Sequence, residues 1–125
     1  MKKITVTKNA PNPIGPYSQG VTAAGFVFVS GQVGKDPVSG NIVTDTIENE
    51  TKMVMNNVKG ILEQAGSSLD KVVKTTIFLT NLDDFSKVNE VYGSFFKGDY
   101  PARETVQVSR LPLNVNVEIS VIAIA

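Results

Sequence analysis

Two ionisable side chains near the end of this 125-residue sequence, Arg103 and Glu118, are the strongest candidates for chemistry. The planar guanidinium of Arg103 can bind a carboxylate through two parallel hydrogen bonds at any working pH. Glu118 stands at the polar end of a mostly apolar segment, where partial burial would raise its pKa toward the range of a useful base. From these segments alone, a surface or interface salt bridge is the commoner role for Arg103, and an exposed strand end explains Glu118 equally well.

Uncharged polar residues add a second group of candidates. Asn89 lies one helical turn from Phe85 and Tyr92, so its amide would need hydrogen-bond partners, most often in a loop. The segments Gly15-Pro16-Tyr17-Ser18-Gln19 and Ser30-Gly31-Gln32 place glycine beside donors and acceptors, which permits close approach of a ligand to the backbone. Turn formation explains these glycines equally well.

The sequence contains neither histidine nor cysteine. It therefore excludes a Ser-His-Asp triad, a Cys-His dyad, a thiolate zinc site and an imidazole general base. Carboxylates, hydroxyls, amides, lysine, arginine, backbone groups and bound water remain available for catalysis.

Length and composition predict a single domain, residues 1–125. Hydrophobic residues make up 42% of the chain and charged residues 19%, close to the averages of globular domains. We find no internal repeat, low-complexity stretch or linker that would divide the chain. A chain of this length buries about two thirds of its unfolded surface, so a sizeable core is expected.

Charge and hydropathy limit the expected partners. The twelve Lys and Arg residues balance twelve Asp and Glu residues, so no net charge attracts nucleic acid or an anionic membrane. No run of eighteen apolar residues is present, and the two N-terminal lysines have no apolar segment behind them. We therefore expect a cytoplasmic protein without nucleic-acid or membrane partners.

The elements that position the candidate residues begin with a loop and a hairpin. Three prolines within residues 9–16 exclude a helix there. Residues 19–33 are rich in β-branched and aromatic side chains and are interrupted at Ala24-Gly25, which predicts a hairpin. Residues 36–41 form a cluster of turn residues that ends this β region.

Two amphipathic helices and a central strand follow. Asp45 and Glu48 have the spacing of a capping box, and apolar residues then recur at helical spacing until Gly66. Residues 72–80 are mostly apolar and predict a central strand. A second helix is expected from about residue 84 to residue 98. Its buried stripe should comprise Phe85, Val88, Tyr92, Phe95 and Phe96.

Two final strands, at residues 105–109 and 117–124, complete the prediction. This order of elements indicates an α+β fold: an open mixed sheet with both helices packed on one face. The uncovered sheet face would be an association surface, which predicts a homo-oligomer.

Taken together, these segments resemble the RidA/YjgF family of reactive intermediate deaminases over nearly the whole chain. The order and spacing of the motifs carry the resemblance. They are Ile14-Gly15-Pro16-Tyr17-Ser18-Gln19, Ser30-Gly31-Gln32, Asn56-Asn57-Val58, residues 73–79, residues 85–92, Pro101-Ala102-Arg103 and Val117-Glu118-Ile119.

The resemblance implies a chorismate-mutase-like homotrimer with a central barrel and a cleft at each subunit interface. It implies hydrolysis of 2-imino and enamino acids, such as 2-iminobutanoate and 2-iminopropanoate, to 2-oxo acids and ammonia, with no cofactor or metal. Arg103 would bind the substrate carboxylate, and Glu118 would orient or activate water. The residues lining the cleft would be Tyr17, Ser30, Gly31 and Asn89.

Three positions depart from the family pattern: Glu104, Thr105 and Ser120. Glu104 could pair with Arg103, although strand alternation directs the two side chains to opposite faces. Two other functions stay open. One is a regulatory module that binds small carboxylates and signals to a partner. The other is a ribonuclease or translation inhibitor, which the balanced charge and the lack of histidine disfavour.

Overall fold

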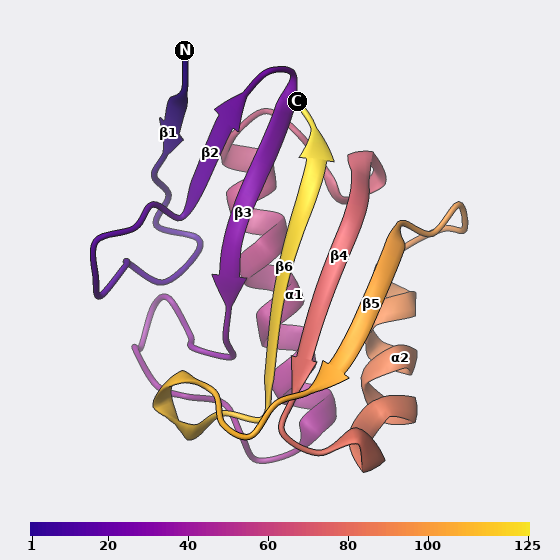
Figure 1. Cartoon of the computed structure of the whole chain (residues 1–125). Helices are drawn as coiled ribbons and strands as arrows, with labels where there is room; N and C mark the ends of the chain where they lie inside the picture. The colour runs from indigo at the N-terminus through magenta and orange to yellow at the C-terminus, as the bar shows by residue number, and fades with distance from the viewer.

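A mixed six-stranded sheet with two α-helices on one face forms the fold (Figure 1), and the computed structural model describes residues 1–125. The strand order is β1-β2-β3-β6-β4-β5, and only β4 and β5 pair in parallel. The strands are β1 (Lys3–Thr5), β2 (Gly20–Ala23), β3 (Phe26–Gln32), β4 (Val72–Leu79), β5 (Ala102–Gln107) and β6 (Val117–Ile124). The α-helices are α1 (Ile47–Gln64) and α2 (Phe85–Ser94), and the short 3₁₀ helices are η1 (Leu69–Lys71), η2 (Leu82–Asp84) and η3 (Pro112–Asn114).

The predicted hairpin is confirmed as β2 and β3. Ala24 and Gly25 at its turn have φ angles of 52° and 83°. A two-residue type I′ turn requires positive φ at both positions, and its twist matches that of the strands. Strand β1 was not predicted, because a three-residue segment at the sheet edge carries too little pattern. Its pairing with β2 is antiparallel, with Lys3 opposite Thr22.

The start of α1 corrects the predicted capping box. Thr46, not Asp45, is the N-cap, and its hydroxyl accepts a hydrogen bond from the Asn49 backbone N–H at 3.0 Å. Asp45 instead accepts from the Asn49 side chain at 3.1 Å. Both oxygens satisfy groups in the first turn, so the sequence signal located the helix start to within one residue.

The β4–α2–β5 unit places the candidate arginine. Strand β5 begins at Ala102, three residues earlier than predicted, because it pairs with β4 from Lys74 onward. Helix α2 ends at Ser94 and does not continue to Gly98. Its predicted buried stripe is correct for Val88 and Tyr92, but Phe85 is 38% exposed.

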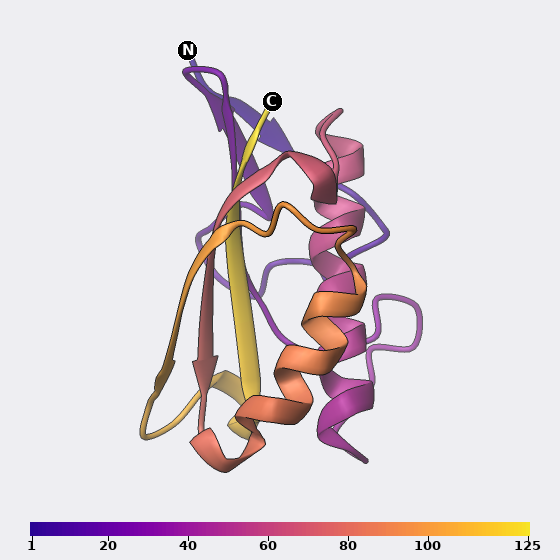
Figure 2. The same cartoon turned by 90° about the vertical axis from the view of Figure 1, so that its right-hand side faces the viewer.

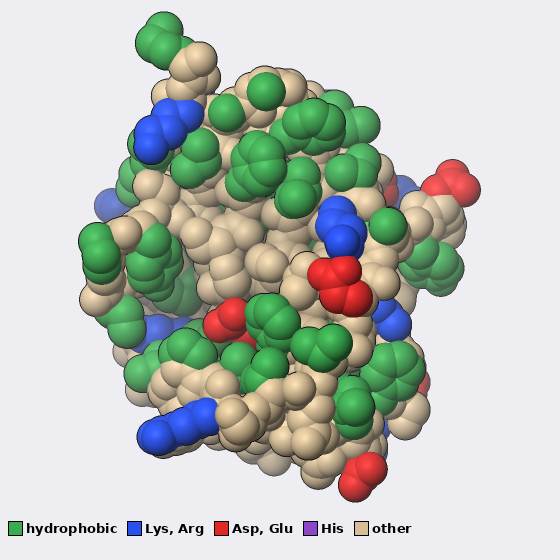
Figure 3. All heavy atoms as spheres, viewed as in Figure 1, with side chains coloured by type: hydrophobic (Ala, Val, Ile, Leu, Met, Phe, Trp, Pro, Cys, Tyr) green, Lys and Arg blue, Asp and Glu red, His purple; other side chains and the backbone are tan.

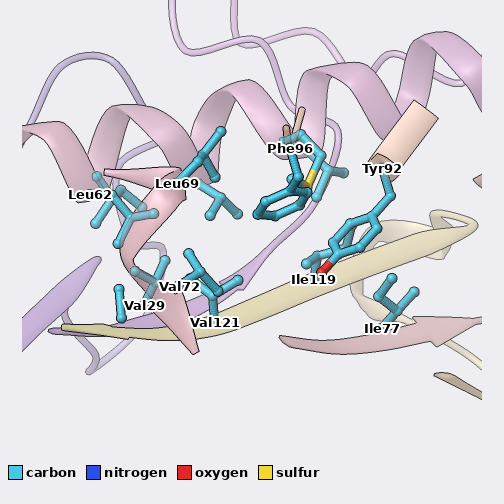
Figure 4. Close-up of a cluster of buried hydrophobic side chains, with 14 of the residues drawn as sticks. Val29, Leu62, Leu69, Val72, Ile77, Tyr92, Phe96, Ile119 and Val121 are labelled. Atoms are coloured by element: carbon cyan, nitrogen blue, oxygen red, sulfur yellow. The ribbon is translucent and has the colours of Figure 1, made fainter. Parts of the chain in front are cut away.

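The core lies between the sheet and the helices, which Figure 2 shows on one side only. Alternate residues of β6, from Val117 to Ala123, are buried against the helices. Figure 4 shows Tyr92 of α2, and Phe96 just after this helix, facing Ile119 and Val121 of β6. This confirms the predicted two-layer architecture.

The other sheet face is open in the chain (Figure 3). Its partly exposed side chains include Phe26, Phe28, Val106 and Ile124. Bare apolar surface of this kind is what we expected from helices on one face alone. No helix of the structure is both long and apolar enough to cross a membrane.

Candidate functional site

Arg103 lies on the helix-covered face of the sheet, beside α2. Its neighbour on β4 is Thr75, which is fully buried. The guanidinium carbon lies 5.6 Å from the ring centre of Phe85 and 5.2 Å from that of Tyr92. Aromatic faces attract a cation within about 6 Å, so the two rings fix the guanidinium without neutralising it.

The charge of Arg103 is not paired within the chain. The one ion pair of the structure joins Lys74 to Glu104 at 2.8 Å, so Arg103 forms no salt bridge within its own chain. Glu104 lies on the open face, as strand alternation predicted. Its hydrogen bonds with Lys74 and with the Thr76 hydroxyl lower the pKa of Glu104. The departure at Glu104 therefore does not occupy Arg103.

Arg103 borders a hollow of about 470 Å³, referred to below as the arginine hollow. It is lined by Asn89, Tyr92, Gly93, Tyr100, Pro101 and Arg103. The Asn89 side-chain oxygen is buried and has no hydrogen-bond partner, which is uncommon for a buried amide. The Thr105 hydroxyl, on the same strand face as Arg103, is also buried without a partner. The region thus combines an unpaired cation with two unsatisfied polar atoms.

Tyr92 supports this hollow from the core. Its hydroxyl donates to the Thr75 hydroxyl at 2.9 Å, and its ring packs against Phe96. Burial raises the pKa of Tyr92, although its hydrogen bond to Thr75 and the charge of Arg103 act in the opposite direction. The phenol therefore stays neutral and presents a fixed aromatic face to Arg103.

Glu118 lies on the opposite, open face of the sheet. Its strand neighbours Val117 and Ile119 are buried against the helices, and its partner on β4 is Phe78. A Cβ added to Gly31 would lie 2.6 Å from a Glu118 carboxylate oxygen, so a larger residue at position 31 would displace the Glu118 carboxylate. Burial raises the pKa of Glu118, as we expected from its place in the sequence.

Glu118 borders a second hollow, of about 490 Å³, referred to below as the glutamate hollow. Ile14, Gly15, Tyr17, Ser30, Gly31, Val33, Pro112, Leu113 and Glu118 line it. The Ser30 hydroxyl donates to the Ser18 carbonyl and so ties β3 to the loop that carries Tyr17. Leu113 has a φ of 61°, an uncommon backbone state for leucine, and is half exposed at this hollow.

The six predicted site residues therefore form two groups. Arg103 and Asn89 line the arginine hollow, whereas Tyr17, Ser30, Gly31 and Glu118 line the glutamate hollow. Because Arg103 and Glu118 point to opposite faces of one sheet, a single chain cannot bring them to one small substrate. Any site that uses both must form between two copies of the chain.

Two supporting residues were not predicted. Gln19, which is 2% exposed, accepts from the Thr7 N–H and donates to three carbonyls, those of Thr7, Ala10 and Pro11, so it holds the proline-rich loop in place.

Glu50 is fully buried on α1 and accepts three hydrogen bonds, from the backbone N–H groups of Asn116 and Val117 and from the Asn116 side chain. It thereby fixes the start of β6, immediately before Glu118. Its place on the polar side of the helix start gave no sequence signal of burial.

The structure contains no group of three or more His, Cys, Asp or Glu side chains placed to hold a metal ion. The chemistry available at the two hollows consists of an unpaired guanidinium, a carboxylate of raised pKa, amide and hydroxyl groups, and aromatic rings.

The fold, two helices on a mixed six-stranded sheet, is an α+β fold of the YjgF type. The solved structure of Escherichia coli TdcF with bound serine superposes with a TM-score of 0.95, at 43% identity over 98% of each chain. Residues 7–125 match the family model described as Endoribonuclease L-PSP. The chain therefore belongs to the RidA/YjgF family.

Curated relatives agree with this assignment. A RutC family protein of Pyrococcus horikoshii is 50% identical over 98% of both chains. The human 2-iminobutanoate/2-iminopropanoate deaminase is 41% identical over 99% of this chain and 90% of its own length.

Proposed function

We propose that the protein hydrolyses reactive 2-imino and enamino acids, such as 2-iminobutanoate and 2-iminopropanoate, to 2-oxo acids and ammonia. The observation that carries this proposal is the unpaired Arg103 guanidinium, held between two aromatic rings at a hollow. A fixed, unpaired guanidinium is suited to a carboxylate, which every 2-imino acid carries. The human relative named as a deaminase for these two substrates supports the choice of reaction.

In the proposed mechanism, Arg103 of one copy binds the substrate carboxylate and Glu118 of a neighbouring copy activates water. The carboxylate of Glu118 takes a proton from the water while the oxygen attacks the imine carbon. Glu118 then gives this proton to the nitrogen, which yields a neutral carbinolamine. Transfer of the carbinolamine hydroxyl proton to the amino nitrogen through Glu118 breaks the carbon–nitrogen bond and releases ammonia and the 2-oxo acid. An imine is already electrophilic, so positioning and one base can suffice.

The assembly we propose is a closed ring of copies, a homotrimer, joined through the open sheet face. Three facts support association through this face: its exposed phenylalanine and aliphatic side chains, the separation of Arg103 from Glu118, and the family membership. Tyr17, Ser30, Gly31 and Asn89 would line the shared cleft.

A coupled assay tests this function. A pyridoxal-phosphate amino-acid dehydratase supplies the imine, and its decay is followed optically with wild-type protein, with Arg103→Ala and with Lys87→Ala. Lys87 is an exposed cation of α2 outside both hollows, so it is the matched control. We expect wild type and Lys87→Ala to accelerate decay, and Arg103→Ala to lose roughly 100-fold or more in kcat/KM.

Two outcomes would contradict the proposal. Full activity of an Arg103→Ala protein with unchanged assembly would show that Arg103 does not bind the substrate carboxylate. No acceleration by wild type would favour a module that binds small carboxylates or amino acids, an alternative that the serine-bound E. coli structure makes concrete.

A further inference from the structure

A lysine lies beside the glutamate hollow with no acidic partner. Lys35 lines a recess of about 50 Å³ that shares Ile14, Tyr17, Gly31, Val33 and Leu113 with the glutamate hollow. The two spaces are therefore adjacent. No carboxylate of the chain lies within ion-pair distance of Lys35. Among the residues that line these two spaces, Lys35 is the one cation.

The backbone of Lys35 is held firmly. Asn57 of α1 is 1% exposed and donates to the carbonyls of Val33 and Lys35, at 3.2 and 2.9 Å. Lys35 also pairs with Ile42 in an isolated β-bridge. The fixed backbone keeps the base of the partly buried Lys35 side chain at the recess.

The recess matches a small anionic group in size and character. Its volume exceeds the roughly 30 Å³ that one water occupies in the liquid. Its other lining residues combine apolar side chains with the uncharged polar residues Asn12, Tyr17 and Gln32, so Lys35 brings its only formal charge. Figure 3 shows both acidic and basic side chains among hydrophobic ones in the hollowed left half of this face. A carboxylate placed in the glutamate hollow would be repelled by the charge of Glu118. The charge of Lys35 would attract a carboxylate into the recess.

We propose that Lys35 forms an anion-binding subsite next to the glutamate hollow, and that it directs the protein toward 2-imino acids whose side chain carries a second carboxylate. This inference rests on the proposed deaminase function. In that setting Arg103 of the neighbouring copy binds the first carboxylate, Glu118 faces the imine carbon, and Lys35 binds the acidic side chain as a compact cation with three donors.

The test compares two imines made in place by amino-acid oxidases in the presence of catalase. Aspartate or glutamate gives an imine with two carboxylates, and alanine gives a neutral counterpart. Decay is measured by competition with semicarbazide for wild type, Lys35→Met, Lys35→Arg and Lys52→Met. Methionine keeps the length of the side chain, arginine keeps the charge, and Lys52 is an exposed control on α1.

We expect Lys35→Met to lose about tenfold or more in kcat/KM on the dicarboxylic imine, mainly through KM, and less than about twofold on the neutral one. Lys35→Arg should retain most of the preference, and Lys52→Met should match wild type. An equal loss on both imines, or no loss on either, would overturn the subsite while leaving the deaminase function in place.

Calorimetry separates the subsite from catalysis. Wild type should bind 2-oxoglutarate more tightly than 2-oxobutanoate, and Lys35→Met should lose that difference. If wild type accelerates neither imine but shows this Lys35-dependent preference, the proposed function fails and the subsite stands. Equal binding of the two oxo acids by wild type would refute the subsite.

Discussion

At the scale of single residues, Glu118 is kept in surroundings that oppose its charge. It lies partly buried above Gly31, and this burial raises the pKa of Glu118 above that of an ordinary glutamate. The same burial that makes the carboxylate a better base makes its ionised form less stable in the folded chain. Activity and stability should therefore respond oppositely to its replacement.

Activity should fall as pH decreases through the raised pKa of Glu118, because the proposed mechanism needs the ionised base. The acid limb of kcat/KM should have its midpoint above the ordinary glutamate value of 4.5. Glu118→Gln should lower kcat/KM by about 100-fold and abolish this limb. A pH profile of imine hydrolysis for both proteins checks this, and an unchanged acid limb in Glu118→Gln would assign it to another group.

Stability should change in the other direction. Between the unfolded and folded pKa values the folded state binds more protons, so the free energy of unfolding decreases as pH rises. At pH 8, Glu118→Gln should melt at or above the temperature of wild type, in place of the usual loss of about 1 kcal/mol. The advantage should vanish near pH 4. Thermal melts at the two pH values decide the matter, and a clear destabilisation at pH 8 would argue against a strained carboxylate.

At the scale of elements, one buried carboxylate joins α1 to β6. Glu50 is fully buried and accepts three N–H hydrogen bonds from Asn116 and Val117. Removing the carboxylate takes the acceptor from these donors, and an unsatisfied buried donor costs on the order of 1–3 kcal/mol. The start of β6, and with it Glu118, depends on this contact.

Glu50→Ala should therefore lose about 3 kcal/mol or more of unfolding free energy. Glu48→Ala, an exposed acid in the same first turn of α1, should lose less than about 1 kcal/mol. Urea unfolding of both variants beside wild type measures the difference. Similar losses for the two variants would mean that the Glu50 contacts contribute little.

The sequence was informative about elements wherever periodicity decides structure. The hairpin, α1, β4 and β6 follow from alternation, turn residues and helical spacing, and β6 was located at residues 117–124 as observed. The start of β5 and the pairing of β1 depend on neighbours distant in sequence, so local pattern missed them. The roles of Gln19 and Glu50 arise from tertiary hydrogen bonds for the same reason.

The residues of the candidate site were predictable from the sequence, but their arrangement in space was not. Motif resemblance selected Arg103 and Glu118, whereas only the sheet register shows that they face opposite sides. Lys35 escaped notice because nothing in its local sequence distinguishes it from a solvated lysine. Its significance comes from the recess it lines.

At the scale of the whole molecule, the open sheet face connects assembly to activity. Phe28 is 43% exposed there, and its ring lies 6.5 Å from that of Phe26. Phe28→Asp should leave the single chain folded, because the side chain is outside the core, but should dissociate the assembly and reduce activity at least tenfold. Sedimentation velocity and the imine assay measure both effects, with Lys59→Asp on the exposed side of α1 as the control. An intact, active assembly of Phe28→Asp would place the interface elsewhere.

In the proposed assembly, one site takes Arg103 from one copy and Glu118 from another. Mixing two inactive variants tests whether the site is shared between copies. Arg103→Ala and Glu118→Gln are co-expressed in equal amounts, and hydrolysis is compared with that of each variant alone. In a closed ring with random mixing, about a quarter of the sites combine an intact arginine with an intact glutamate, so activity should recover to about a quarter of wild type. No recovery in verified mixed assemblies would show that Arg103 and Glu118 do not act together across copies.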